Sequence, residues 1–194
     1  MKRKDRRPVP AAAGALALAG ILGLGGCGFI GQPQKAGAEL SEWFTVSSPV
    51  FRDGRDLPTR YACTTYPGGA ATTPPLMWSG TPAGTRSYAI VMDDPDAVDG
   101  AFVHWVIAGI DGTTTQLVEG AKLDKAVQGL NTSDKVGYSP PCPAKGERHR
   151  YRFTIYALDT EVPFRSGATL EDSLGAIAEH TVGRGRITGN FGSK

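Results

Sequence analysis

Two carboxylates spaced two residues apart are the first feature of this sequence that could do chemistry. Asp94 and Asp96 lie on either side of Pro95, directly after an apolar run. A proline restricts the residue before it to extended backbone, so both carboxylates can lie on one side of the turn. Carboxylates in such a position can orient an imidazole or bind a cation. Taken alone, Asp-Pro-Asp is also a common polar turn.

Two histidines and a proline-rich loop supply further polar groups. His104 lies inside the apolar run 102–107, and His149 follows the loop that contains Tyr138 and leads to Tyr151. Prolines restrict the freedom of a loop, so this one can form a stiff wall. An isolated histidine in a strand is usually a satisfied core residue, and the loop alone fits an ordinary connection equally well. Only the combination indicates a site.

The elements that must position these residues are mostly strands. Three segments carry β-branched and aromatic residues between Gly, Pro and Asp, which predicts central strands: Arg86–Asp93, Phe102–Ala108 and Tyr151–Leu158. Shorter strands are expected at Trp43–Ser47, Thr59–Cys63, Leu76–Trp78 and Arg186–Phe191.

One helix is expected near the C-terminus. Thr169 precedes Asp172 with capping-box spacing, and Gly183 would end the helix. Its apolar face would consist of Leu170, Leu174, Ile177, Ala178 and Thr181, with His180 at the surface. A weaker helical pattern covers Leu117–Ala126. The chain is therefore predicted to be mainly β, a β-sandwich with one or two short helices.

The N-terminus has the pattern of a lipoprotein signal peptide. A basic segment, residues 2–7, precedes the apolar run 11–26, which is short for a bilayer span, and Leu24-Gly25-Gly26-Cys27 resembles a bacterial lipobox. We expect removal of residues 1–26 and lipidation of Cys27, which would anchor the protein to the extracytoplasmic face of the cell membrane. An uncleaved N-terminal anchor is the alternative.

The remaining chain is expected to be a tether, residues 27–42, and one domain, residues 43–194. The whole chain has 21 basic and 19 acidic residues, of which the leader holds five and one, so the mature net charge is about −2. A chain with this balance and no basic run lacks the electrostatic footprint of a nucleic-acid-binding protein.

Two cysteines remain once Cys27 is assigned to the lipid. Cys63 and Cys142 form an even pair in a protein expected outside the cytoplasm, which favours a disulfide. Two buried free thiols are the alternative, because separation along the chain does not show that two Cα atoms are close.

Several motifs together resemble the phosphatidylethanolamine-binding protein family, in its bacterial Raf kinase inhibitor-like branch. They are Ser48-Pro-Val-Phe, Pro74-Pro-Leu-Met-Trp-Ser-Gly, Asp94-Pro-Asp-Ala, Phe102-Val-His-Trp, and Cys142-Pro through His149-Arg-Tyr151. They run in order from about residue 47 to 157, and more weakly to 191. The resemblance implies a β-sandwich with a small anion-accepting pocket.

The resemblance also implies which residues form that pocket. They are Asp94, Asp96, Phe102, His104, Tyr138, Pro141, His149 and Tyr151, with the Pro140–Pro141 region and Phe102 as walls. Imidazoles and tyrosyl hydroxyls can donate to phosphate-like oxygens, and carboxylates can orient the imidazoles. Val98 replaces a proline of the family motif and Pro140 replaces a glycine, which removes a backbone N–H from the pocket.

The leading functional hypothesis is a non-enzymatic, membrane-anchored binding protein for a small anionic or phospho-head-group ligand, which could regulate a partner protein of unknown identity. A tether of about fifteen residues would allow a root-mean-square reach of roughly 20 Å from the bilayer. We expect no cofactor and no metal, because the spacing of the carboxylates and imidazoles matches no dedicated metal motif.

Two other function classes stay open. A hydrolase could use Ser139 or Cys142 as the nucleophile and His149 as the base, but the Ser139 context is not the Gly-x-Ser-x-Gly elbow. A protein inhibitor whose pocket is incidental is the other.

Overall fold

The computed structural model describes residues 43–193. The predicted signal peptide, Cys27 and the predicted tether lie outside these residues. The described chain forms two sheets and a single α-helix, α1, Leu170–His180. This confirms the prediction of a mainly β fold with a helix near the C-terminus. No helix in residues 43–193 is long and apolar enough to cross a bilayer.

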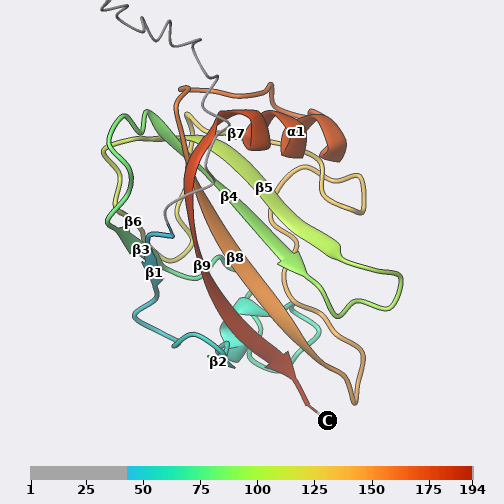
Figure 1. Ribbon diagram of the computed structural model, residues 1–194. Helices are drawn as coiled ribbons and strands as arrows, with labels where there is room; N and C mark the ends of the chain where they lie inside the picture. The colour runs from blue at the N-terminus through green and yellow to red at the C-terminus, as the bar shows by residue number, and fades with distance from the viewer. Residues whose placement is uncertain (1–42, 194) are drawn as a thin grey trace, which may run out of the picture. The chain divides into compact units, whose positions relative to one another are not determined.

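The larger sheet has six strands in the order β2-β9-β8-β4-β5-β7 (Figure 1). Their bounds are Arg55–Asp56 for β2, Thr181–Gly192 for β9, Arg148–Leu158 for β8, Ser87–Asp94 for β4, Phe102–Asp111 for β5 and Val127–Gln128 for β7. All neighbours pair antiparallel except β2 and β9. The smaller sheet contains β1, Thr45–Ser47, β3, Leu76–Ser79, and β6, Gln116–Leu117.

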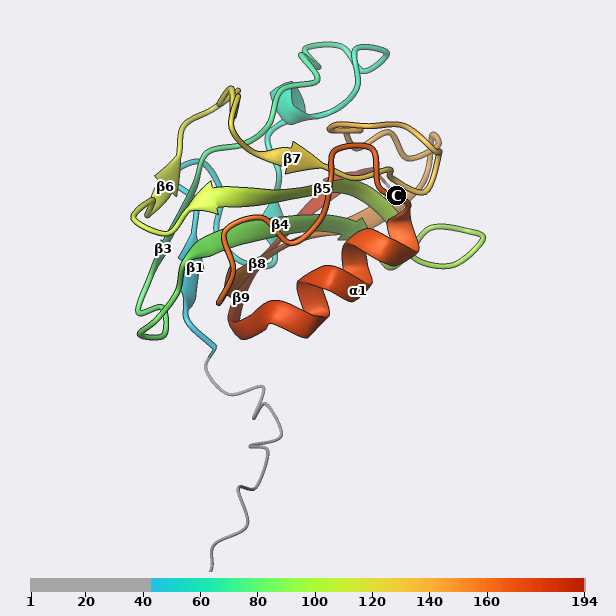
Figure 2. The same cartoon turned by 90° about the horizontal axis from the view of Figure 1, so that it is seen from above.

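Alternation along the central strands gives the large sheet two apolar faces. On β8, Tyr151, Phe153 and Ile155 point into the main core, which also contains Trp78 of the small sheet. The opposite face of β4, β5 and β8 packs against α1, whose Ile177 is 2% exposed (Figure 2). The central strands are therefore buried on both sides, as their continuous apolar sequence predicts.

Four local predictions are wrong in detail. Thr59–Cys63 is not a strand: Thr59–Tyr61 is a 3-10 turn, in which the Tyr61 N–H donates to the Pro58 carbonyl. Leu117–Ala126 is not a helix, since Leu117 pairs with Leu76 in the small sheet and Gly120 has φ of 64°. The C-terminal strand begins at Thr181 rather than at Arg186, so Gly183 lies in β9 and the helix ends at His180.

The start of the helix agrees with its sequence signal. The Thr169 side chain accepts a hydrogen bond from the backbone N–H of Asp172, as the capping-box spacing predicts. His180 is partly exposed, but its Nδ1 lies 2.9 Å from a carboxylate oxygen of Asp159, a partner that the sequence did not indicate.

Candidate functional site

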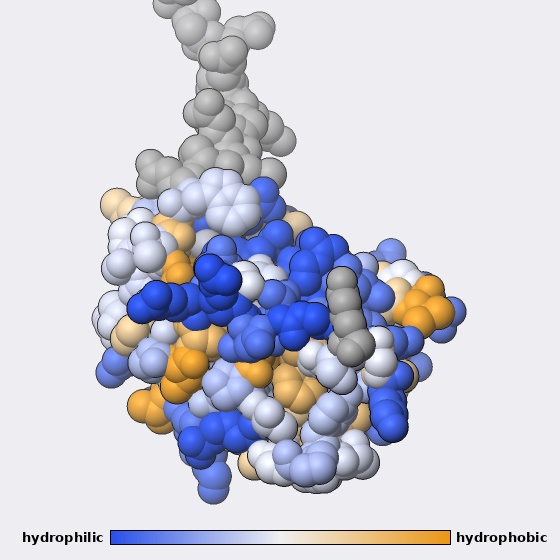
Figure 3. Space-filling model, turned by 90° about the horizontal axis from the view of Figure 1, so that it is seen from below, coloured by the Kyte–Doolittle hydropathy of each residue, from blue (hydrophilic) through white to orange (hydrophobic). Residues whose placement is uncertain are grey.

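A cavity of about 270 Å³ lies where β4 ends and where β5 and β8 begin. Antiparallel pairing places Asp94 opposite Phe102, and β8 runs beside β4 with its first residues at the same end. Figure 3 shows one side of the molecule where hydrophilic side chains gather, with hydrophobic ones in the gaps between them. The cavity is lined by Asp94, Ala97, Val98, Phe102, His104, Ser139, Pro140, Cys142, Pro143, Ala144, Glu147, His149 and Tyr151.

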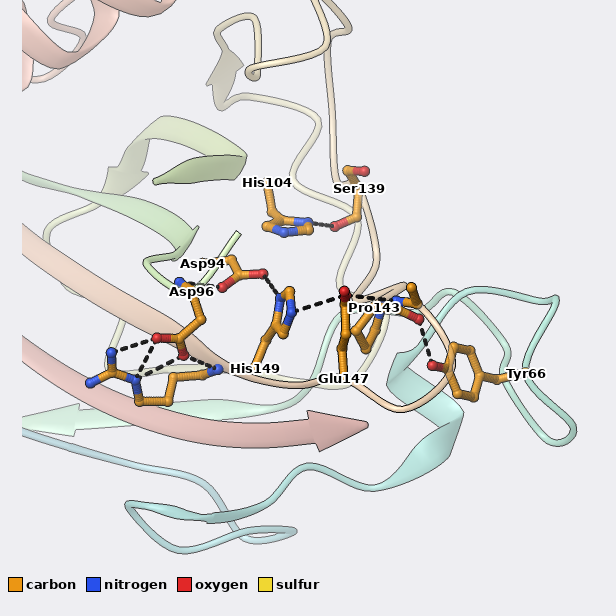
Figure 4. Close-up of polar contacts among 10 residues, drawn as sticks. Tyr66, Asp94, Asp96, His104, Ser139, Pro143, Glu147 and His149 are labelled. Carbon is orange, nitrogen blue, oxygen red and sulfur yellow. Dashed lines mark hydrogen bonds and ion pairs between the residues drawn. The ribbon is translucent and has the colours of Figure 1, made fainter. Parts of the chain in front are cut away.

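Asp94 and His149 form the central pair of this pocket (Figure 4). The Nδ1 of His149 lies 2.6 Å from one Asp94 oxygen, and the backbone N–H of Asp96 donates to the other at 2.8 Å. Asp94 is 3% exposed, and these two contacts, one to each carboxylate oxygen, hold its side chain in place. A carboxylate in this position fixes the orientation of the imidazole ring.

Asp96 turns away from the pocket towards Arg150. The Arg150 guanidinium donates to both Asp96 oxygens, and the Arg150 backbone N–H adds a third donor. These bonds, led by the side-chain bond from Arg150, lower the pKa of Asp96 to about 2. The sequence pattern suggested two carboxylates in one site, but only Asp94 lines the cavity.

His104 is buried at the floor of the pocket. Its ring is 7% exposed and lies between the rings of Phe102 and Tyr151, with centroid distances of 4.6 and 5.3 Å. Burial lowers the pKa of His104, with its bond to the Ser139 carbonyl acting in the opposite direction. The Nδ1 lies 2.9 Å from that carbonyl and must donate to it, so the Nε2 of the neutral ring is an acceptor.

The buried state of His104 predicts a pH dependence of stability. Its pKa is lower in the folded than in the unfolded protein, so the unfolded chain binds more protons between the folded pKa and about 6.5. This contribution to the free energy of unfolding is present above about pH 6.5 and is lost as the pH falls towards the folded pKa. Urea unfolding at pH 7.5 and 5.5 should show a smaller pH effect for His104→Gln than for the wild type. Equal pH effects would contradict it.

Glu147 is a charged pocket residue that the sequence did not indicate. One of its carboxylate oxygens lies 3.3 Å from the Nε2 of His149 and accepts a bond from the Ala144 N–H at 3.2 Å. Its side chain is 41% exposed, so it can move towards solvent. The one sequence signal for a pocket role is its position two residues before His149, at the end of the loop that leads into β8. That signal is weak, because an acidic residue in a loop has no distinctive pattern.

The two tyrosines occupy different places. Tyr151 lines the pocket, and burial raises its pKa, with the charge of Asp94 adding to the rise. Tyr138 instead packs in the core against Trp105, at 5.7 Å between ring centroids, and its hydroxyl donates to the Tyr61 carbonyl at 3.3 Å. The structure does not bring Tyr138 into the pocket.

The proline wall is formed by Pro140 and Pro143 rather than by Pro141. The Pro141 ring is buried, and its carbonyl accepts a bond from the Cys63 N–H at 2.9 Å. Phe102 lines the cavity, as does Val98, which is 83% exposed and leaves that wall open.

Cys63 and Cys142 form a disulfide, with a Cα–Cα distance of 5.5 Å, which confirms the predicted pair. The disulfide ties the pocket wall at Cys142 to the 3-10 turn near Cys63. A bonded Cys142 offers no thiolate, and within residues 43–193 no hydrogen bond joins the Ser139 hydroxyl to a histidine. Across the same residues no group of three His, Cys, Asp or Glu side chains is arranged to bind a metal ion.

The geometry agrees with the known family that the sequence matches. The model of the phosphatidylethanolamine-binding protein family covers residues 47–192. This chain belongs to that family. The pocket described above lies within the matched segment, as do both cysteines of the disulfide.

Similar proteins include members with and without an N-terminal extension. "Putative lipoprotein LppC" of Mycobacterium tuberculosis is 35% identical over 198 residues and covers 94% of this chain and 95% of that protein. A UPF0098 protein of Methanothermobacter thermautotrophicus is 41% identical over 151 residues, covering 75% of this chain and 97% of its own length. Three quarters of this chain therefore match almost the whole length of the second relative.

Two solved structures show the same fold. Escherichia coli YbcL is described as a new member of the mammalian PEBP family. It aligns with a TM-score of 0.71 and 32% identity, over 79% of this chain and the whole of the YbcL chain. CT736 of Chlamydia trachomatis, titled as a homologue of the family, aligns with a TM-score of 0.70 and 34% identity over the same shares.

Proposed function

We propose that this phosphatidylethanolamine-binding protein relative is a non-enzymatic, extracytoplasmic binding protein that takes a small anionic or phospho-head-group ligand and is anchored by lipid on Cys27. The observation that carries the binding proposal is His149, held by Asp94 at 2.6 Å at the edge of a cavity of about 270 Å³. A carboxylate-oriented imidazole and the Tyr151 hydroxyl are polar groups suited to phosphate oxygens.

The anchoring part of the proposal is supported by the lipoprotein relative. Its alignment covers 94% of this chain, more than residues 43–194 contain, so the similarity extends into the segment that carries the leader or the tether. The wild type should incorporate a labelled fatty acid, and Cys27→Ser should not. An unlabelled wild type would contradict lipid anchoring.

The binding proposal is tested by NMR of the imidazoles. The chain has three histidines, of which His104 and His149 line the pocket and His180 pairs with Asp159 elsewhere. Titration with inorganic phosphate and, separately, with phosphoethanolamine should shift the ring signals of the first two in a saturable way and leave His180 in place as an internal control. Unchanged signals for both pocket histidines would overturn the proposal.

Glu147 is expected to compete with an anionic ligand. Its carboxylate oxygen, 3.3 Å from the Nε2 of His149, stands where a phosphate oxygen would bind. Glu147→Gln removes a negative charge that would repel an anionic ligand. Near the protein surface such a repulsion between two charges amounts to about 1 kcal/mol or more. We therefore expect phosphate to bind about fivefold more tightly to Glu147→Gln in calorimetric titrations. Weaker binding would mean that Glu147 supports the ligand instead.

A further inference from the structure

A second polar surface lies on the face of β8 and β9 that is turned away from the main core, beside the part of this face that packs against α1. Arg152, Thr154 and Tyr156 of β8 point to this face, and register places Tyr156 opposite Arg184 and Thr154 opposite Arg186. Arg152 follows on β8, two residues from Thr154. Burial raises the pKa of Tyr156, and the charges of Arg186, Arg184 and Arg152 oppose the rise.

This surface carries an excess of positive charge. Within residues 43–193, Asp93 forms an ion pair with Arg152, but Arg184 and Arg186 have no carboxylate within ion-pair distance. The Nε of Arg186 donates instead to the hydroxyl of Thr154 at 2.8 Å. Three arginines and one aspartate leave a local net charge of about +2, in contrast to the negative charge expected for the mature chain.

Trp43 lies beside these arginines and is exposed. The Cζ of Arg184 is 4.7 Å from the centroid of the Trp43 ring and that of Arg186 is 5.9 Å away, within the range of cation–π contacts. Trp43 is 60% exposed, whereas Trp78 and Trp105 are 3% and 5% exposed.

The backbone holds this tryptophan on β9. The Phe44 N–H donates to the Arg184 carbonyl at 3.1 Å, and Trp43 bridges to Arg184. Gly185 makes the close approach possible, because a Cβ at that position would lie 2.4 Å from the Phe44 carbonyl oxygen. The exposed ring is thus attached to the same strand as Arg184 and Arg186.

We propose that Trp43, Arg152, Arg184 and Arg186 form a surface that docks onto the anionic head groups of a lipid bilayer. Arginines near a bilayer are attracted to anionic lipids, and a tryptophan ring favours the level of the head groups. The surface begins at the residue that directly follows the predicted tether, 27–42, so a chain anchored at Cys27 enters the domain here. The inference rests on the proposed anchor for its orientation, while the charge and the exposed ring act without it.

The part of the docking surface around Trp43 and Arg184 lies at the other end of β8 from the pocket, whereas Arg152 lies midway along the strand. His149 pairs with Phe191, and Tyr156, about seven residues further along β8, pairs with Arg184, a separation of roughly 23 Å. They also lie on opposite faces of the sheet, since Tyr151 points into the core and Arg152 away from it. A docked domain would therefore hold its pocket away from the bilayer to which it is anchored.

Vesicle binding of residues 28–194 tests the proposal without the lipid or the pocket ligand. This piece contains the whole domain, and the solved relatives consist of the domain alone. It should co-sediment with vesicles of phosphatidylcholine and phosphatidylglycerol but not with phosphatidylcholine alone. Arg184→Gln with Arg186→Gln should weaken the partition on the order of 20-fold. The fluorescence of the wild type should shift to the blue on binding, and Trp43→Phe should lose that shift.

A control pair of substitutions tests whether the docking surface, and not the pocket end of the domain, contacts the vesicle. Lys135→Gln with Lys145→Gln also removes two exposed charges, from the loops at the pocket end, and should leave vesicle binding unchanged. Loss of binding in this control, or unchanged binding in the double arginine variant with a native thermal transition, would overturn the proposal. So would equal binding to both kinds of vesicle. None of these results depends on whether phosphate binds His104 and His149.

Discussion

Replacing Cys63 and Cys142 with alanine should lower the free energy of unfolding by about 4 kcal/mol. The bond joins residues 79 positions apart, and a cross-link that closes so long a loop removes much of the conformational entropy of the unfolded chain. Guanidinium unfolding of the oxidised wild type and of the double variant Cys63→Ala with Cys142→Ala measures the difference, as the two free energies of unfolding extrapolated to water.

A reducing agent provides the control for the disulfide. It should destabilise the wild type by a similar amount and leave the alanine pair unaffected. The pocket wall should survive, because the Pro141 carbonyl accepts the Cys63 N–H at 2.9 Å and the Pro143 carbonyl accepts the Tyr66 hydroxyl at 2.6 Å. A loss of stability below about 1 kcal/mol would show that the unfolded chain is already constrained without the bond.

The central strands could be predicted from the sequence because they are buried on both faces. Long apolar runs such as 87–94 and 102–111 have few other stable states than the middle of a sheet. The helix predicted over residues 117–126 is wrong because the apolar pattern is short and because the conformation of Leu117 depends on pairing with β3, a tertiary contact. Likewise, β9 alternates glycines and arginines, so its first half carries no apolar signal although every second residue is buried.

The site shows the same division between local and tertiary information. Asp94, His104, His149 and Tyr151 follow from their place at strand ends. Asp96 could not be separated from Asp94 by sequence, because its partner Arg150 lies 54 residues away. The hydroxyl of Tyr138 predicts a pocket residue, but its ring packs against Trp105 in the core, a tertiary contact that the sequence does not show.

The position of the docking surface changes what the anchor implies for the ligand. With tether length alone in view, head groups of the same bilayer are within reach of the pocket. With the domain docked through Trp43 and Arg184, the pocket is directed away from that bilayer at a distance of roughly 23 Å along β8. A docked domain would then meet soluble ligands, or head groups presented by another surface, more readily than its own membrane.

Asp94→Asn should weaken phosphate binding by about tenfold to a hundredfold. The substitution keeps an acceptor for the Asp96 N–H, but it removes the carboxylate that orients the His149 ring at 2.6 Å. Removing a negative charge would by itself favour an anion. The loss of the fixed ring orientation is the larger effect, because the ligand is proposed to contact the Nε2 of His149, on the side of the ring away from Asp94.

Asp96→Asn is the matched control, since it removes the neighbouring carboxylate with the same change of charge. Its oxygens are bound by Arg150 and do not line the cavity, so phosphate affinity should change by less than about twofold. Calorimetric titration of both variants with phosphate measures the contrast. Equal losses would show that the charge of the whole turn matters, and not the orientation of His149. An unchanged affinity in Asp94→Asn would show that His149 needs no carboxylate to bind the anion, which removes the physical basis on which the pocket was assigned to phosphate-like ligands.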